Sequence, residues 1–243
     1  MFEAEISASK LQDTVSKIDA LVDECKVHLN EDGLSVQAVD PASVGMVDVS
    51  LPKEDFAQYE ADGELLGLNL VRFGEVVGMG NSGDTVALEL NEETRKLRVK
   101  IGGLRYTLAL IDPSSIHQEP TVPDLDNAEF DVVGEEIQTA VKAAGLVSDH
   151  MGLRHDHGSL EGFAEGDTDD VSVDMDTVDG RDIPDDEEAS LFSLDYLDAM
   201  AKGLPKDSDV TVELGDDYPV KMTAPLAEYG EMTYLLAPRI ENG

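Results

Sequence analysis

The sequence predicts an α+β fold built from two similar domains, and three observations support the prediction. Short segments with the two-residue apolar alternation of half-buried strands outnumber segments with helical periodicity. Each half of the chain contains only two segments typical of helices, among many strands. The second half also repeats residues of the first, and a duplication of this length constrains the whole architecture.

The duplication is visible at two constant offsets. An offset of 126 pairs early positions of the two halves: Leu11-Gln12 with Ile137-Gln138, Val15 with Val141, Asp23 with Asp149, and Leu34 with Leu160. An offset of 124 pairs later positions: Leu70 with Leu194, Phe73 with Leu197, and Glu89-Leu90 with Glu213-Leu214. A change in loop length would produce the two-residue difference. Chance contributes to such apolar matches, but the order of elements also repeats.

The first half opens with a strand and a helix. Residues 2–7 alternate as a strand, and Ser9 is the expected N-cap of a helix that reaches Val22, with apolar residues at helical spacing. Two strands follow, joined by the hairpin turn Glu31-Asp32-Gly33. The strands expected in the rest of this half cover 24–30, 33–39, 44–51, 65–69, 85–90, 96–101 and 104–111, with a short helix at 71–80.

Residues 112–127 contain three prolines and show no periodicity, so they predict an extended connector. The second half then repeats the order of the first, with helices at 135–147 and 194–202 and a long acidic loop over 176–188. Its expected strands cover 129–133, 149–155, 159–164 and 171–175, and three final strands reach residue 237. The predicted domains are therefore 1–111 and 128–243, with 112–127 between them.

Composition limits the class of protein. The chain has 243 residues, enough for two domains that each bury a core. No apolar run reaches the ~20 residues that a membrane helix needs, and the first residues do not read as a secretion signal. The one cysteine, Cys25, suits a reducing compartment, so we expect a cytoplasmic protein that is not bound to a membrane.

The net charge is −36, with 53 acidic and 17 basic residues. Such self-repulsion opposes folding in dilute buffer but is largely screened at ~1 M salt, where the Debye length is ~3 Å. The acids are spread along the chain rather than gathered in a tail, which favours a halophile's protein over an ordinary protein with an acidic tail.

Several motifs suggest chemistry but lack an essential part. The loop Gly78-Met79-Gly80-Asn81-Ser82-Gly83-Asp84 has the glycines of a phosphate loop without its lysine, so we interpret it as a helix-ending turn. A calcium loop beginning at Asp174 would break its alternation at Val178 and end on Asp185 instead of glutamate. His150, His155 and His157 suggest a metal site, although His155-Asp156-His157-Gly158 is more typical of a solvated hairpin tip.

No nucleophile motif or dinucleotide fingerprint is present in the sequence. We therefore assign no catalytic residue, no metal and no cofactor. An unrecognised hydrolase stays open, and so does an acidic cation-binding protein, which the carboxylates of 167–188 would suggest.

Three segments together resemble proliferating cell nuclear antigen, the DNA sliding clamp of archaea and eukaryotes. They are Gly33-Leu34-Ser35-Val36-Gln37-Ala38-Val39-Asp40, Phe56-Ala57-Gln58-Tyr59 before Leu68-Asn69-Leu70, and Tyr234-Leu235-Leu236-Ala237-Pro238-Arg239-Ile240-Glu241. The resemblance extends over the whole chain and is weakest over 147–188. It implies a ring of three identical subunits, with the helices lining the hole.

If the helices face DNA, they should be less acidic than the rest of the chain. Counted over 9–22, 71–80, 135–147 and 194–204, the expected helices carry a net charge of −2 over 48 residues, against about −7 for an average stretch of this chain. The resemblance implies that the cations of these helices, with one more just beyond the last helix, face DNA: Lys10, Lys17, Arg72, Lys142 and Lys202, and then Lys206. They are few for the family, and each alone is equally consistent with a solvated helix face, so cations or water are expected to bridge to phosphate.

The resemblance also implies a pocket for short apolar-aromatic peptides of partner proteins. The matching positions come from both halves and the connector: Val39, Val44, Met46, Pro120, Val122, Pro219, Leu235, Ala237 and Pro238. Leu235 stands where many relatives have tyrosine. Head-to-tail pairing of the edge strands 104–111 and 171–175 is expected to close the trimer through Arg105, Thr107, Ala109, Val171 and Val173.

The predicted function is that of a non-enzymatic sliding clamp that encircles duplex DNA. It tethers DNA polymerase, ligase and nucleases through short peptide motifs, and a clamp loader places it on DNA. The alternative, an acidic cation-binding protein, would show tight stoichiometric calcium binding by calorimetry.

Overall fold

The computed structural model describes residues 1–117, 123, 125, 127–156, 159–183 and 188–239. The chain forms two compact units. The first contains Met1–Ser43, Val47–Thr121 and Leu226–Met232, and the second contains Val44–Met46, Val122–Pro225 and Thr233–Gly243. Each unit thus takes a short segment from the other side of the expected connector. The domain bounds 1–111 and 128–243 remain predictions.

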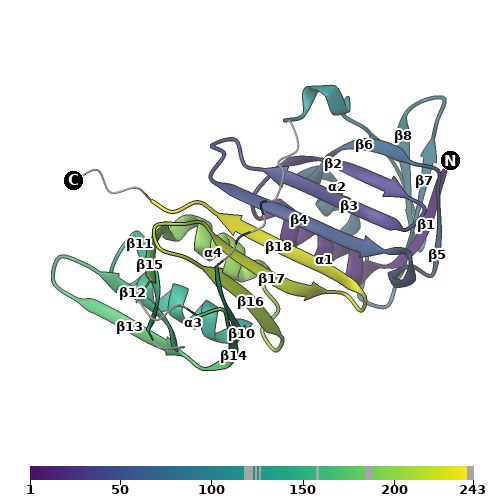
Figure 1. The fold of residues 1–243 in the computed structure, drawn as a ribbon. Helices are drawn as coiled ribbons and strands as arrows, with labels where there is room; N and C mark the ends of the chain where they lie inside the picture. Colours follow the sequence, from purple (N-terminus) through teal and green to yellow (C-terminus); the bar gives the residue numbers. More distant parts are fainter. Residues whose placement is uncertain (118–122, 124, 126, 157–158, 184–187, 240–243) are drawn as a thin grey trace. The chain divides into compact units, whose positions relative to one another are not determined.

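The first unit packs two helices against strands that form two sheets (Figure 1). One sheet has the spatial order β5 (Gln58–Ala61), β1 (Phe2–Ser7), β7 (Thr85–Asn91), β8 (Lys96–Ile101) and β9 (Leu104–Ala109). The other strands lie in the order β4 (Gly45–Pro52), β3 (Gly33–Val39), β2 (Glu24–Asn30) and β6 (Glu64–Asn69). The helices are α1 (Ala8–Asp19) and α2 (Leu70–Val77), and two short 3-10 turns cover Lys53–Asp55 and Pro113–Ser115.

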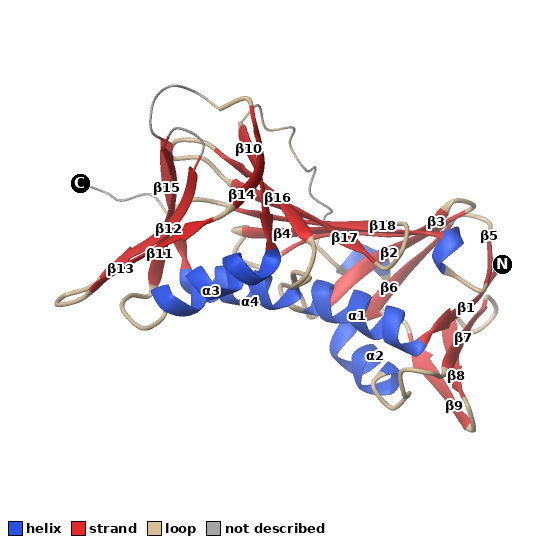
Figure 2. Ribbon diagram, turned by 90° about the horizontal axis from the view of Figure 1, so that it is seen from below, coloured by secondary structure: helices blue, strands red, loops and turns tan. Residues whose placement is uncertain are grey.

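The second unit repeats this arrangement. One sheet has the order β13 (Asp170–Met175), β12 (Ser159–Glu165), β11 (His150–Asp156) and β15 (Glu188–Ser193). The remaining strands lie in the order β14 (Thr177–Arg181), β10 (Ala128–Val133), β16 (Asp209–Leu214), β17 (Val220–Leu226) and β18 (Gly230–Leu236). The turn from β17 into β18, Leu226–Met232, belongs to the first unit. The helices are α3 (Gly134–Ala144) and α4 (Leu194–Gly203). Within each unit the two helices lie side by side (Figure 2). The predicted α+β class is confirmed.

Two glutamines at equivalent positions show why the duplication is visible in the sequence. The side chain of Gln12 donates to the carbonyls of Val77 and Gly80, 2.8 and 2.9 Å away, at the end of α2. The side chain of Gln138 donates to the carbonyls of Ala201 and Leu204, 3.0 and 3.1 Å away, at the end of α4. Both therefore satisfy carbonyls that a helix end leaves without partners. The donors are related by the offset 126 and the acceptors by 124, so the duplication is confirmed.

The helix start was predicted two residues too late. Ser7, not Ser9, is the N-cap of α1, and its hydroxyl accepts from the backbone N–H of Lys10 at 3.3 Å. The last residue of β1 therefore also caps the helix, with no linker between them. The apolar stripe of α1 was predicted correctly, and Leu11, Val15 and Ile18 are buried.

The sequence also missed three strands: β5, β14 and β15. The predicted acidic loop over 176–188 is wrong in part, because β14 pairs there with β10. Arg181 on β14 contacts Glu129 at 2.7 Å and both carboxylate oxygens of Asp131, at 2.7 and 3.2 Å. Arg181 holds the pKa of Asp131 below its usual value. The helix-ending turn is confirmed, since α2 ends at Val77 and Gly78 is its C-cap.

His155 is not part of a solvated tip. Its side chain is 0 % exposed, packs against the Phe130 ring with 5.3 Å between ring centroids, and contacts Glu188 through Nε2 at 3.1 Å. His157 and Gly158 lie outside the described residues. Cys25 is also buried, and burial raises the pKa of its thiol to about 12. The thiol is therefore protonated and unreactive at neutral pH.

Candidate nucleic-acid interface and binding surfaces

The six cations predicted to face DNA differ in what they contact. Five lie on the helices, and Lys206 follows α4. Lys10 is half-buried and Lys17 is only 5 % exposed, whereas the other four are exposed. The predicted DNA-facing cations therefore fall into two groups, two that are largely covered by the chain itself and four that solvent can reach.

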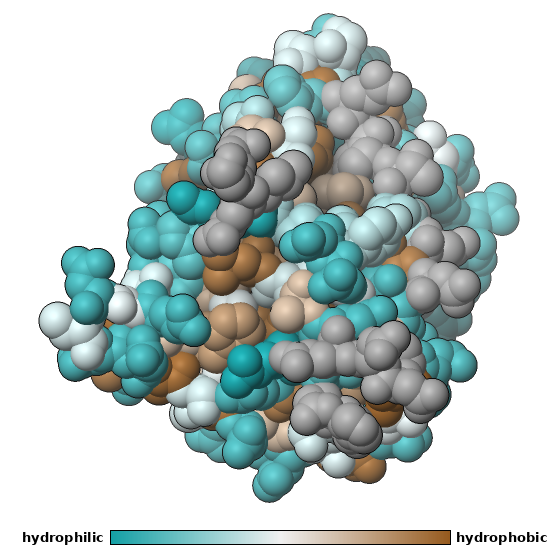
Figure 3. All heavy atoms as spheres, turned by 60° about the vertical axis from the view of Figure 1, so that its left-hand side comes forward, coloured by the Kyte–Doolittle hydropathy of each residue, from teal (hydrophilic) through white to brown (hydrophobic). Residues whose placement is uncertain are grey.

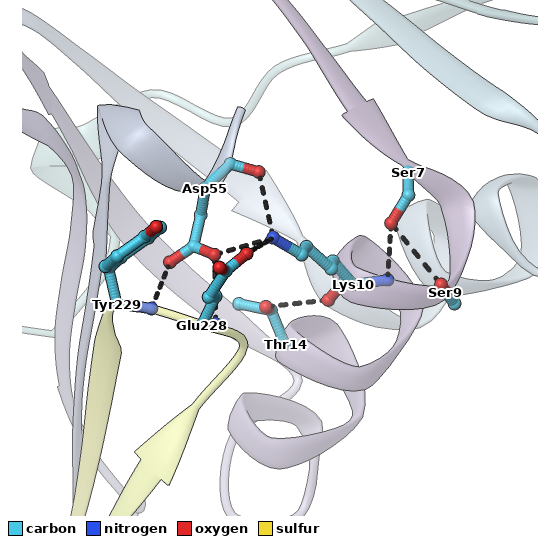
Figure 4. Close-up of polar contacts among 7 residues, drawn as sticks. All are labelled: Ser7, Ser9, Lys10, Thr14, Asp55, Glu228 and Tyr229. Carbon is cyan, nitrogen blue, oxygen red and sulfur yellow. Dashed lines mark hydrogen bonds and ion pairs between the residues drawn. The ribbon is translucent and has the colours of Figure 1, made fainter. Parts of the chain in front are cut away.

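Lys10 is held by a buried carboxylate within the first unit (Figure 4). Its ammonium lies 2.7 Å from Oδ1 of Asp55, whose side chain is 0 % exposed, and 3.9 Å from Oε2 of Glu228. Asp55 also accepts from the backbone N–H groups of Glu228 and Tyr229, both at 3.0 Å. These four residues, Lys10, Asp55, Glu228 and Tyr229, are called the Asp55 latch below.

The latch sets the charge state of Asp55. Burial alone would raise the pKa of this carboxyl, but the Lys10 ammonium and the two backbone donors outweigh it, so its pKa lies below the usual value. The ionised carboxylate joins Lys10 of α1 to the turn between β17 and β18, from whose Glu228 and Tyr229 N–H groups it accepts hydrogen bonds. Lys10 therefore has a structural partner besides any phosphate.

Two other helix cations also have carboxylate partners. Lys17 forms an ion pair with Asp13, and Lys202 forms one with Asp198, each one helical turn earlier. Exposed pairs of this kind contribute little to stability, so Lys202 can exchange its partner readily. Within the described part of the chain, no ion pair of Arg72, Lys142 or Lys206 is found. These three cations and Lys202 are the exposed ones of the predicted set.

The pocket positions fall into different units. Val44, Met46, Pro219, Leu235, Ala237 and Pro238 belong to the second unit. The backbone N–H of Ala237 donates to the Val44 carbonyl at 2.9 Å, which brings two of these positions together. Val39 belongs to the first unit, and Pro120 and Val122 lie outside the described residues. The full pocket remains a prediction.

The last described residues border a cavity of about 850 Å³ in the second unit. Pro238 and Arg239 line it together with Phe163 and Leu191, and the N–H of Arg239 donates to the Leu191 carbonyl at 2.6 Å. The face drawn in Figure 3 is covered mostly by hydrophilic side chains, with apolar side chains in the hollow between them. Pro238 therefore borders a cavity whose lining mixes apolar side chains with polar and charged ones, among them His150, Glu165 and Asp217.

The predicted trimer residues lie on two sheet edges. Arg105, Thr107 and Ala109 are exposed on β9, and Val171 and Val173 are half-buried on β13. The strand expected over 104–111 ends at Ala109, because the chain then leaves the sheet and Ile111 forms an isolated bridge with Gly67.

No cluster of three potential metal ligands is found among the described residues. Asp179 and Gly180 of the suggested calcium loop belong to β14, and Asp179 lies 3.6 Å from Arg181. In the described residues no helix is both long and apolar enough to span a membrane.

Sequence reasoning missed the Asp55 latch. Asp55 follows Lys53 and Glu54 in an ordinary charged segment, and its backbone partners are 173 and 174 residues away. No local signal distinguishes this carboxylate from the other acids. The two glutamines that bond the helix ends were recognisable in the sequence, because Gln12 and Gln138 align with each other at the offset of 126.

Comparisons with known proteins agree with this architecture. The profile of the proliferating cell nuclear antigen N-terminal domain matches residues 1–102. The DNA polymerase sliding clamps of Natronomonas pharaonis and Methanococcoides burtonii are 52 % and 43 % identical, with both chains fully covered. A solved structure of A. fulgidus PCNA, bound to the C-terminal region of FEN-1, superimposes over the full length with a TM-score of 0.92 and 32 % identity. PCNA from Thermococcus kodakaraensis matches 98 % of this chain with a TM-score of 0.90 and 27 % identity. The chain therefore belongs to the proliferating cell nuclear antigen family of DNA polymerase sliding clamps.

Proposed function

We propose that this chain forms a homotrimeric ring that encircles duplex DNA and tethers replication and repair enzymes to it. The observation that carries the proposal is the duplicated helix pair, held by equivalent glutamines, in a chain that matches sliding clamps over its full length. A ring needs a repeated inner surface, and two such pairs in each of three copies supply one.

The charge of the helices supports their position around DNA. The observed helices α1 to α4 carry a net charge of −2 over 41 residues, while the whole chain carries −36 over 243. An average stretch of this chain with the same length would carry about −6. The helices therefore carry less net negative charge than the rest of the chain. They do not carry enough basic residues to neutralise many phosphates.

DNA contact is therefore proposed to be weak, and in part mediated by ions and water. Arg72, Lys142, Lys202 and Lys206 are the exposed candidates for phosphate contact, while Lys10 and Lys17 mainly support the helices. Retention on DNA then comes from topology, because a closed circle cannot leave a circular duplex. Tethered partners gain effective concentration without a tighter contact.

Partner enzymes are proposed to bind through short peptides at the predicted pocket that includes Pro238. The pairing of Ala237 with Val44 and the cavity beside Pro238 support a docking site in the second unit. The solved A. fulgidus relative is bound to the C-terminal region of FEN-1, which supports partners that bind through a short segment, and the names of the curated relatives support DNA polymerase. Nucleases belong to the proposed set as well. A ligase and a clamp loader complete the proposed set of partners.

We infer a non-catalytic role in the cytoplasm. The proposal assigns no residue to chemistry and no cofactor, because the tether works by holding other enzymes on DNA. The rival reading, an acidic cation-binding protein, is not favoured by the family match.

The proposal is tested by primer extension on circular single-stranded DNA at high salt, with a haloarchaeal polymerase and clamp loader. Adding the clamp should lengthen the products made in a single binding event. The control is the Pro238→Asp variant, which should assemble normally but support shorter products. Products of equal length with and without the wild-type clamp would contradict the proposal.

A further inference from the structure

The cavity of about 850 Å³ in the second unit is largely separate from the predicted peptide pocket. Of the described pocket positions, Pro238 alone lines it. The floor of the cavity is the outer face of β12, β11 and β15, and β15 lies at the end of this sheet. The chain at Pro238 and Arg239 and the turn at Asp217 border the cavity along β15. All these segments belong to the second unit, so one copy of the chain completes the cavity.

The middle of the floor is apolar. Gly152 of β11 pairs with Phe163 of β12 on one side and with Leu191 of β15 on the other. A Cβ on Gly152 would collide with the Phe163 ring, so the ring covers the glycine. Phe163 and Leu191 are both half-buried, and Pro238 extends the apolar surface. This part of the cavity can therefore hold an aliphatic side chain.

A carboxylate lies at each end of the apolar floor. At one end, the backbone N–H of Asp217 donates to the Ala189 carbonyl at 3.1 Å. At the other end, Glu165 lies beside His150, where the antiparallel strands β11 and β12 begin and end. His150 pairs with Ser193 of β15. Ala189 and Ser193 are four residues apart on one strand, so the two ends of the cavity are separated by ~14 Å.

The two carboxylates are available to a cation from outside. Glu165 and Asp217 are exposed, and neither forms an ion pair within the part of the chain that the structure describes. His150 at the rim already contacts Asp149 at 2.5 Å. Arg239 enters the cavity between the two ends, beside the middle of the floor. A cation is therefore favoured at either end and disfavoured in the middle.

We propose that this cavity binds an extended basic segment of a partner protein, with cations at its first and fifth positions and an aliphatic residue at its third. Alternate side chains of an extended chain point to the same side, and residues four apart are separated by ~14 Å. The two cations then reach Asp217 and Glu165, while the aliphatic residue covers Phe163 and Leu191. The inference goes beyond the proposed function, because it concerns a second surface for partners.

Other occupants fit this surface less well. A nucleic acid would bring its phosphates against Glu165 and Asp217 in a chain with a net charge of −36. A second copy of this chain offers the required spacing once in its sequence, at Lys202, Leu204 and Lys206. Leu204 is only 4 % exposed, because it is part of the core, and it cannot enter a cavity of another copy. A segment of a different protein remains the occupant that matches in charge and spacing.

The test is peptide binding to the full chain, followed by fluorescence anisotropy from ~0.5 to ~2 M KCl. The labelled probe is Gly-Lys-Ser-Leu-Ser-Lys-Gly with both ends capped. The control peptide, Gly-Lys-Lys-Ser-Leu-Ser-Gly, has the same composition but adjacent lysines. The wild type should bind the probe at least ~10-fold more tightly than the control, because only the probe reaches both carboxylates while its leucine covers the floor.

Three variants assign the two cation contacts. Glu165→Gln and Asp217→Asn should each weaken binding of the probe by about threefold, which is typical of one exposed ion pair. Asp207→Asn is the matched control, since it removes the same charge from an exposed acid outside the cavity. It should leave the affinity for the probe unchanged. All these positions are on the surface, so the variants should fold like the wild type.

Each outcome decides for or against the inference. A preference for the probe that both cavity variants reduce supports it. Equal affinity for the two peptides, or an equal loss in Asp207→Asn, overturns it. Displacement of the probe by an oligonucleotide would assign the cavity to nucleic acid and also overturn it. A changed molar mass in Glu165→Gln, without weaker probe binding, would assign this face to a second copy. The primer-extension assay tests the proposed function separately.

Discussion

Replacing Asp55 with alanine removes the centre of the Asp55 latch. The carboxylate is fully buried and accepts three hydrogen bonds, one from the Lys10 ammonium and two from backbone N–H groups of the β17–β18 turn. Alanine leaves these donors without their acceptor. The free energy of unfolding should therefore fall, although the fold of each unit should be kept.

The magnitude follows from the three contacts. A neutral hydrogen bond contributes ~1 kcal/mol net, and one to a charged group ~1.5–3 kcal/mol. Lys10 is 30 % exposed in its side chain, so water partly replaces the lost ion pair and the lower values apply. Asp55→Ala should thus lower the free energy of unfolding by about 3 kcal/mol. Asp55→Asn, which keeps one acceptor oxygen, should cost about half of this.

The pH dependence has a definite sign. The pKa of Asp55 in the folded chain lies below its ordinary value of 3.8, so its contribution is complete above that value. It is lost as the pH falls through the lower folded pKa. The stability difference between wild type and Asp55→Asn should therefore be constant near neutrality and shrink only below about pH 4.

The assay is denaturant unfolding at high salt and one fixed protein concentration, so that assembly affects all variants alike. Lys10→Met is the matched control, since it removes the ion pair but keeps both backbone hydrogen bonds, and it should cost about 1.5 kcal/mol. A loss below ~0.5 kcal/mol in Asp55→Ala would refute the reasoning. An equal loss in Asp55→Ala and Lys10→Met would show that the backbone contacts contribute nothing.

Three further predictions concern the repeat, the edge and the pocket. Gln12→Leu and Gln138→Leu each leave two helix-end carbonyls without a donor, so each should lower the free energy of unfolding by ~2 kcal/mol, as denaturant titration measures; unequal costs would contradict equivalent caps. Thr107→Pro removes an N–H of the open edge and should shift the ring toward monomer in light scattering, while Thr107→Ser should not; a fully trimeric proline variant would exclude this edge from the interface. Pro238→Asp should weaken binding of a polymerase-derived peptide by at least ~2 kcal/mol in calorimetry without changing the molar mass, and unchanged affinity would move the docking site elsewhere.

Much of the fold was predictable because its signals are local. Strands such as β2, β3 and β8 have the expected bounds, since their alternating apolar residues and flanking turns act over a few residues. The repeat was visible because Gln12 and Gln138 play the same role. Each donates hydrogen bonds to the carbonyls at the end of a helix, Gln12 at α2 and Gln138 at α4.

The missed elements depend on distant partners. β14 is exposed over much of its length and contains the pair Asp179-Gly180, so its composition is that of a loop. It is a strand because it pairs with β10, where Arg181 finds Glu129 and Asp131. The N-cap was misplaced since both Ser7 and Ser9 have the required hydroxyl, and only the bend between β1 and α1 selects one.

The candidate site was predictable at the level of residue type but not of partners. The cations of the helices were identified from sequence, yet the burial of Lys17 and the Asp55 partner of Lys10 come from tertiary packing.

The central claim is encirclement, and retention on circular DNA tests it most directly. The clamp is loaded by a clamp loader onto nicked circular DNA at high salt, and the DNA is then cut once by a restriction enzyme. Because the helices carry a net charge of −2, affinity for the ends of linear DNA should be very weak. We predict that the clamp stays on the circle and is lost after linearisation. Equal retention on circular and linear DNA would mean ordinary surface binding and would contradict the account.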